Sequence, residues 1–495
     1  MKSTTAETGT RWEFGLALGL ILVTFIAYAP ALHNGFVFDD YLLITENPMI
    51  KAENGLYRFW FTTEALDYYP LTWSLWWVEW RLWGNNPSGY HVINVLLHAI
   101  NALLVWQILQ RLKVPGGWLA AMVFAIHPVN VATVAWISEQ KNTLSMLFSL
   151  IAILLYLKFE EENRWRWYGC SFVMFLMALL SKTAVPMLPV VLLGCLWWMK
   201  KRVKWNDFVR SVPFFGLSLV FGVATLWFQH NRALEYQQTV QMGLAAQLAM
   251  AGLVPWFYLE KALVPLHLTV IYPEWQIGAS RWMGYLPGLA LVGCFGLFWS
   301  KRRSWGRPLF FGLGYFVVML LPVLGFFDQG FYRFSLVADH WQYYSIVGVV
   351  ALAVATAKWI GSRLDERGQH WGTMAGMAVL VMLGIGTWSR SCVYTNDETL
   401  WQDNATKYPN AWIAQNNVGA ALLQRGQLDD AIEHLQQALR VKPDNAGVQF
   451  NLAIAFERTG RTEEAIKHYE QVLQIDPSLS SARARLDRLR AIPGR

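Results

Sequence analysis

The chain has 495 residues, of which 55% are hydrophobic and only 15% charged, and it contains 27 tryptophans. This composition is typical of a chain that lies mostly within a lipid bilayer, and it excludes an ordinary soluble enzyme. The net charge of +7 comes mostly from short loops between apolar runs, so it indicates membrane orientation and not nucleic-acid binding. The four cysteines are far apart in or beside apolar runs, and they predict neither a disulfide framework nor a thiolate metal site.

Eleven apolar runs are predicted to be membrane-spanning helices. They cover residues 14–32, 91–110, 118–137, 143–158, 166–181, 183–199, 211–229, 282–300, 308–326, 341–359 and 371–390. The first run is too long for a signal peptide and lacks a small-residue cleavage motif, so we expect it to be retained as a span. Residues 243–268 contain Pro255, Glu260, Lys261 and Pro265, and we expect this segment to be broken or half inserted.

The basic residues predict which loops face the cytoplasm. The N-terminus and five loops hold 19 of the 41 Lys and Arg residues; the loops run over residues 111–113, 158–166, 200–210, 301–307 and 358–367. Under the positive-inside rule these loops are cytoplasmic. The loop 33–90 and the C-terminal region are therefore expected on the outer face.

Asp39 and Asp40 emerge in that first outer loop, within the stretch HNGFVFDDYLL, just where the chain leaves the bilayer. Two interpretations remain open. The pair belongs to a site at the outer face, or it consists of solvated loop acids or a helix cap.

The same outer loop continues with Tyr69-Pro70-Leu71 and then five tryptophans at helical spacing: Trp73, Trp76, Trp77, Trp80 and Trp83. These rings share one face of a predicted helix, with Glu79 and Arg81 off that face. We expect this helix to lie flat in the headgroup region; packing against neighbouring spans is the compatible alternative.

The second span carries a polar stripe. His91, Asn94, His98 and Asn101 recur at intervals of three, four and three residues, which places them on one side of the helix. The stripe indicates either substrate binding or hydrogen bonding between spans. A two-histidine metal site, completed by Asp39, Asp40 or His127, is a third possibility.

Further polar residues are expected at the same outer face and are candidate substrate-binding groups. They are His127 after the third span, Glu139 before the fourth, Lys182 between the fifth and sixth, and Arg333, Asp339 and His340 before the tenth. Lys182 has an alternative interpretation, since a lysine at the end of a span can extend its ammonium group to the membrane–water interface.

After the last span, residues 393–495 have the composition of a soluble helical domain. Residues 412–445 and 446–479 align at a period of 34, matching Gly426 with Gly460 and Pro443 with Pro477. This is the tetratricopeptide (TPR) pattern. A half repeat over 396–411 and a capping helix over 480–491 are expected to flank the two repeats. The expected fold class is therefore all-α, with a polytopic membrane domain over 1–392 and a short TPR solenoid that binds a peptide or protein.

The order of the short motifs resembles that of the TMTC-type transmembrane and TPR-containing O-mannosyltransferases and their bacterial relatives, within the GT-C glycosyltransferase superfamily. The matching pieces are FVFDD with Asn47-Pro48, Tyr69-Pro70-Leu71, PSGYH through His98, His127-Pro128, AWISE, Ser181-Lys182, Tyr272-Pro273, Ala338-Asp339 and Leu400-Trp401.

This resemblance implies a polyprenyl-phosphate-linked sugar as donor and a hydroxyl or amide as acceptor, with a protein hydroxyl favoured and transfer on the outer face. The catalytic motif of the superfamily falls on Asp39 and Asp40. Lys182, Arg333 and His340 are the candidate partners of the leaving phosphate. A divalent metal stays undecided, because some superfamily members use one and the O-mannosyltransferases do not. Ala132 stands where many relatives have Glu, and Asn142 where some have Asp.

Two other functions compete with a transferase acting on protein. One is a non-catalytic membrane scaffold that anchors the repeats for envelope assembly, and the other is a lipid-linked glycan ligase or polymerase. Eleven predicted spans and a cluster of polar groups favour an enzyme over an anchor. The expected location is a bacterial inner membrane with the repeats in the periplasm, with the endoplasmic reticulum as the alternative.

Overall fold

The computed structural model describes residues 2–233, 242–273, 275, 282–327 and 329–491. These residues fold into helices and connecting loops without a β-strand, so the predicted all-α class is confirmed. They form two compact units. The membrane unit comprises the described residues up to Leu268, those from Trp282 to Arg333, and Asp339–Thr395. The repeat unit comprises the described residues from Asn396 onward together with two short segments, 269–275 and 334–338.

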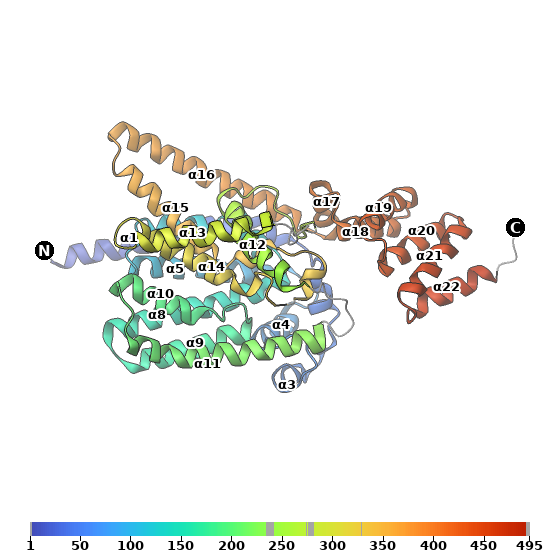
Figure 1. Cartoon of the computed structure of the whole chain (residues 1–495), viewed down its shortest axis with the longest axis horizontal. Helices are drawn as coiled ribbons and strands as arrows, with labels where there is room; N and C mark the ends of the chain where they lie inside the picture. The colour runs from blue at the N-terminus through green and yellow to red at the C-terminus, as the bar shows by residue number, and fades with distance from the viewer. Residues whose placement is uncertain (1, 234–241, 274, 276–281, 328, 492–495) are drawn as a thin grey trace. The chain divides into compact units, whose positions relative to one another are not determined.

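The membrane unit is built from long helices that run roughly parallel to one another (Figure 1). They are α1 (Lys2–Ala27), α5 (Ser88–Arg111), α6 (Gly117–Ala125), α8 (Gln140–Glu162), α9 (Trp165–Ser181), α10 (Leu188–Lys200), α11 (Trp205–Phe228), α12 (Leu244–Leu263), α13 (Leu286–Ser300), α14 (Gly306–Leu320), α15 (Ile346–Gly361) and α16 (Glu366–Val393). Among the described residues, six helical segments are long and apolar enough to cross a bilayer alone, and a bent pair gives a seventh.

All eleven predicted spans fall on helices, but several helices are shorter than predicted. The predicted third span, 118–137, is not one straight helix. The chain bends by 48° between α6 and the turn that leads into α7 (Val131–Val134). The cause is Pro128, which has no N–H to continue α6 and which keeps His127 in an extended conformation.

The segment 243–268 was expected to be broken, and in this respect the prediction is wrong. Residues Leu244–Leu263 form the single continuous helix α12, although Pro255 lies inside it. The break that proline usually causes is absent here. The helix instead ends at Leu263, two residues before Pro265.

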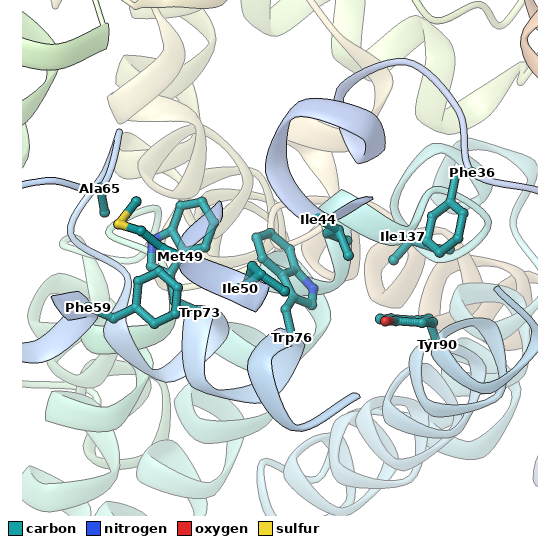
Figure 2. Packing of buried hydrophobic residues seen from close by; sticks show 10 residues of the cluster. All are labelled: Phe36, Ile44, Met49, Ile50, Phe59, Ala65, Trp73, Trp76, Tyr90 and Ile137. Carbon is teal, nitrogen blue, oxygen red and sulfur yellow. The ribbon is translucent and has the colours of Figure 1, made fainter. Parts of the chain in front are cut away.

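The segment 33–90, which is the predicted first outer loop, contributes most of a small hydrophobic core (Figure 2). It contains α2 (Pro48–Lys51), α3 (Gly55–Phe61) and the tryptophan helix α4 (Pro70–Trp83). Trp73 and Trp76 of α4 are each 2% exposed and pack with Met49, Ile50 and Phe59 of the two shorter helices. Trp73 and Trp76 are thus covered by the neighbouring short helices, whereas Trp77, Trp80 and Trp83 are only partly buried. Glu79, which the sequence places off the tryptophan face, is also buried, at 1% exposure.

The repeat unit consists of α17 (Asp397–Lys407), α18 (Trp412–Gln424), α19 (Leu428–Val441), α20 (Ala446–Arg458), α21 (Thr462–Ile475) and α22 (Ser480–Arg490). Gly426 and Gly460, which are 34 residues apart, have φ angles of +77° and +76° in the equivalent turns between paired helices. Glycine adopts this left-handed conformation without steric cost. Asn404 of α17 binds both backbone groups of Ile271, with distances of 2.9 and 3.1 Å, and so holds the segment 269–275 within this unit.

Candidate active site

Asp40 is fully buried and its carboxylate is held by backbone. One oxygen accepts the N–H of Val37 at 3.0 Å, and the other accepts the N–H of Ser138 at 2.7 Å. The residue therefore fastens the first outer loop to the turn that begins α8. Burial raises the pKa of Asp40 to about 7, even though the two backbone hydrogen bonds act in the opposite direction.

Asp39, the neighbouring residue, has a different environment. Its side chain is only partly buried, and its charge interacts with Lys141, Glu139 and Arg333. Burial raises the pKa of Asp39, while the two cations oppose that rise. The preceding residue, Phe38, has a φ angle of +49°, an uncommon conformation for a residue other than glycine. The two neighbouring carboxylates therefore differ: backbone N–H groups hold that of Asp40, whereas that of Asp39 lies near cations.

Glu139 lies at the centre of the charged cluster and is 2% exposed. Lys141 Nζ lies 2.9 Å from one carboxylate oxygen, and Lys182 Nζ lies 3.3 Å from the other. Asn142 Nδ2 donates to the same carboxylate at 2.5 Å. We call Glu139, Lys141 and Lys182 the charged triad. Each ammonium group keeps hydrogens that are not used by Glu139, and these can bind an anionic ligand.

Lys182 points into the protein, because its side chain is 14% exposed and bonds to Glu139. The alternative in which it reaches for the interface is therefore wrong. Burial lowers the pKa of Lys182 to about 8, and Glu139 partly offsets this effect.

His340 and Arg333 approach the same cluster from the segment before α15. His340 Nε2 lies 3.8 Å from Glu139, and burial lowers the pKa of the imidazole to about 3, which keeps it neutral. Its ring packs edge-on against Trp136 and Phe331. Burial likewise lowers the pKa of Arg333, which interacts with Asp39. Asp339 is buried at 2% exposure beside His340.

The polar stripe of α5 does not join this cluster. Asn94 donates to the carbonyls of Thr133 and Val134 and accepts the hydroxyl of Thr143 at 2.6 Å. Two polar atoms lie close to His98, namely the Tyr343 hydroxyl at 2.8 Å and the Ala125 carbonyl oxygen at 3.0 Å. These contacts fit the alternative of hydrogen bonding between helices.

Neither His91 nor His127 bonds to the charged triad in the described part of the chain, and both ring nitrogens of His91 are buried without a hydrogen-bond partner among these residues. His91 is completely buried where α5 begins. His127 accepts the N–H of Val129 at its Nδ1, and its Nε2 lies 3.2 Å from the Ala262 carbonyl of α12. In the described part of the chain, no group of three or more His, Cys, Asp or Glu residues is arranged to hold a metal ion. The two-histidine metal site is therefore not found among these residues.

Two members of the cluster were missed in the sequence. Lys141 lies two residues after Glu139, in the first turn of α8, so its position on the predicted outer face was the available signal. Asp67 lies two residues before Tyr69; its carboxylate accepts Gln229 Nε2 at 2.6 Å and interacts with Lys141 and Lys182. Burial raises the pKa of Asp67 to about 6. Nothing in its sequence context separates it from an ordinary loop acid.

A buried chain of side chains supports the triad from α4. Trp76 Nε1 donates to Gln140 at 2.8 Å, and Gln140 donates to Glu79 at 2.7 Å. The other Glu79 oxygen is buried without a hydrogen-bond partner among the described residues. Because Gln140 directly follows Glu139, this chain positions the start of α8.

Glu79→Gln should make the stability of the protein less sensitive to pH. Burial raises the pKa of Glu79 to about 8, and the bond from Gln140 offsets only part of that rise. A raised carboxyl pKa adds stability that is complete below about pH 4.5 and is lost as the pH rises toward about 8. Glutamine keeps the acceptor for Gln140 without a charge. We expect the midpoint of thermal unfolding to fall less from about pH 5 to pH 8 in the variant; equal falls would contradict this.

Two family models match the chain. The Dolichyl-phosphate-mannose-protein mannosyltransferase model matches residues 70–228, and the Tetratricopeptide repeat model matches residues 405–480. The first includes Lys141 and Lys182 and begins after Asp39. The second covers the repeats, so the predicted TPR solenoid is confirmed.

Curated relatives match over most of the chain. Protein O-mannosyl-transferase F38B6.6 of Caenorhabditis elegans is 23% identical over 86% of this chain and 62% of its own length. Human protein O-mannosyl-transferase TMTC3 is 22% identical over 89% of this chain and 52% of its own length. The chain thus spans about half to three-fifths of these relatives. ArnT from Cupriavidus metallidurans bound to undecaprenyl phosphate is a structural neighbour with 16% identity and a TM-score of 0.40, over 94% of this chain and 81% of that one.

Proposed function

We propose that this chain transfers a sugar from a polyprenyl-phosphate carrier to a protein hydroxyl. The family matches and the relatives confirm the predicted resemblance of the chain to the TMTC-type O-mannosyltransferases. Transfer takes place at the outer face of a bacterial inner membrane. The observation that carries the proposal is the position of Asp39, which is partly exposed and faces Lys141 and Arg333.

Asp39 is the general base. The acceptor oxygen attacks the anomeric carbon of the donor, and the bond from that carbon to the phosphate oxygen breaks. The acceptor proton passes to the Asp39 carboxylate, and the bonding electrons leave with the phosphate. A raised pKa makes this carboxylate a better proton acceptor than a solvent-exposed aspartate.

The charged triad and Arg333 hold the phosphate. A leaving phosphate gains negative charge as its bond to the sugar breaks, so cations fixed beforehand stabilise that state more than the ground state. Lys141 and Lys182 are fixed by Glu139, and each keeps ammonium hydrogens for another acceptor. Neutral His340 adds a hydrogen-bond donor without a charge.

Asp40 has a positioning role. Both of its oxygens are already occupied by the N–H groups of Val37 and Ser138. It therefore fixes the backbone that carries Asp39 against the turn that carries Glu139.

The function is tested by comparing envelope proteins from cells with and without this chain, by intact mass and glycan composition. We expect hexose-sized mass additions on specific proteins that disappear when the chain is removed. A change confined to lipid-linked glycans would support the ligase or polymerase function instead. Unchanged protein and glycan masses would support the scaffold.

A truncation tests the acceptor class. Removing residues 446–495 deletes α20–α22 but keeps α17, whose Asn404 holds Ile271. If the acceptor is a protein bound by the repeats, transfer to protein should fall at least tenfold while the membrane unit stays folded. Full transfer by the truncated chain would contradict a role for these repeats in acceptor binding.

A further inference from the structure

A cavity of about 120 Å³ lies inside the membrane unit, between α5, α8, α10, α14 and α15. Its wall is almost entirely hydrocarbon. The few polar groups on the wall have partners: the Tyr315 hydroxyl donates to the carbonyl of Tyr344, and Trp198 Nε1 donates to the carbonyl of Leu112, both at 2.9 Å. The cavity therefore suits an apolar occupant.

The cavity is elongated along the helices. Its lining residues on α15 run from Val347 to Ala355, a rise of about 12 Å, and those on α14 run from Pro308 to Tyr315, a rise of about 10 Å. A slot that is long and parallel to the helix axes suits an extended hydrocarbon chain. A bound hydrocarbon chain makes dispersion contacts with the wall that an empty cavity lacks.

Basic residues border one end of this cavity. Arg307 immediately precedes Pro308, which lines the cavity, and its guanidinium lies 4.9 Å from the centre of the Trp198 ring, another part of the wall. Arg307 Nε is buried and has no hydrogen-bond partner in the described part of the chain. The guanidinium donates through Nη2 to the carbonyl of Trp198, and the residue is partly exposed, so its other Nη hydrogens at the end of an apolar slot suit an anionic headgroup.

Two exposed lysines lie at the same end. Lys113 directly precedes Val114, which lines the cavity, and Lys358 lies on α15 about one turn beyond Ala355. The Lys358 side chain packs beside Gly116, since a Cβ built there would lie 3.3 Å from its Cγ. All three cations belong to loops or helix ends expected to face the cytoplasm. Basic pockets between spanning helices on that side commonly bind anionic lipids.

We propose that the cavity and these three cations form a binding site for one anionic phospholipid, with an acyl chain in the slot and the phosphate beside Arg307, Lys113 and Lys358. The site is distinct from the proposed active site. The basic end lies where α5 ends at Arg111, whereas the first outer loop with Asp39 precedes the start of α5 at Ser88.

The test measures lipid retention by the full chain purified in mild detergent. Native mass spectrometry should show one bound phospholipid. After delipidation, added phosphatidylglycerol should raise the midpoint of thermal unfolding, and added phosphatidylcholine should not. Ala351→Phe fills the slot and should reduce retention at least tenfold, whereas Ala375→Phe, on an exposed part of α16, should leave it unchanged. Ala355→Phe serves if Ala351→Phe fails to fold.

The headgroup is tested with a second matched pair. Arg307→Gln should reduce the preference for phosphatidylglycerol at least tenfold, and Arg303→Gln, an exposed residue in the same loop, should not. Three results would overturn the proposal: equal retention by Ala351→Phe and Ala375→Phe, no preference for the anionic lipid, or a retained mass that matches a polyprenyl phosphate. Loss of sugar transfer alone bears only on the proposed function.

Discussion

Asp39→Asn should reduce sugar transfer by about 10²- to 10⁴-fold and leave the midpoint of thermal unfolding nearly unchanged. Asparagine has the same size but cannot take a proton from the acceptor hydroxyl. The side chain is partly exposed and makes no hydrogen bond in the described part of the chain, so the folded state loses little. The measurement is single-turnover transfer from a polyprenyl-phosphate sugar to a peptide, together with a melting curve of the same sample.

Asp40→Asn is the matched control, and its expected effect differs in kind. Asparagine has one acceptor oxygen, so one of the N–H groups of Val37 and Ser138 would face an amide NH₂. An unsatisfied buried donor costs about 1–3 kcal/mol, which would appear as a lower melting midpoint. If Asp39→Asn retains transfer while Asp40→Asn loses it with unchanged stability, the two roles are exchanged and the proposed base is wrong.

The sequence was sufficient to predict most of the fold, because helices depend on the pattern of apolar and polar residues in a short stretch of sequence. Apolar runs located the membrane helices, and the 34-residue period located the repeats. The errors occurred at prolines, whose effects depend on their surroundings. Pro128 ends α6, whereas Pro255 is accommodated within α12.

The candidate site was less predictable, because position along the chain does not reveal what surrounds a side chain. Asp39 and Asp40 are adjacent in sequence, and only the fold shows that backbone N–H groups enclose one of them. Glu139 and Lys182 were recognised as outer polar groups, but their direct contact depends on the packing of α8 against α9. The periodicity of His91, Asn94 and His98 correctly described one helix face, but that face packs against other helices.

The second large effect is expected for Glu139→Ala, which should lower the free energy of unfolding by about 3–5 kcal/mol. The substitution removes the one carboxylate that forms ion pairs with both Lys141 and Lys182, whose side chains are 15% and 14% exposed, and leaves them only the longer-range charges of Asp39 and Asp67. A buried charge without a partner is far more costly than a buried pair. Thermal unfolding in detergent measures the loss, and Glu46→Ala, at an exposed position in the first outer loop, should leave the midpoint unchanged.

A triple variant, Glu139→Ala with Lys141→Met and Lys182→Met, separates stability from phosphate binding. Removing all three charges eliminates the uncompensated lysines, so much of the stability lost in Glu139→Ala should return. Transfer should stay at least 100-fold below the wild type, because the cations proposed to stabilise the leaving phosphate are gone. Recovery of both properties would show that the triad only holds α8 and α9 together, and the phosphate would then have to bind elsewhere.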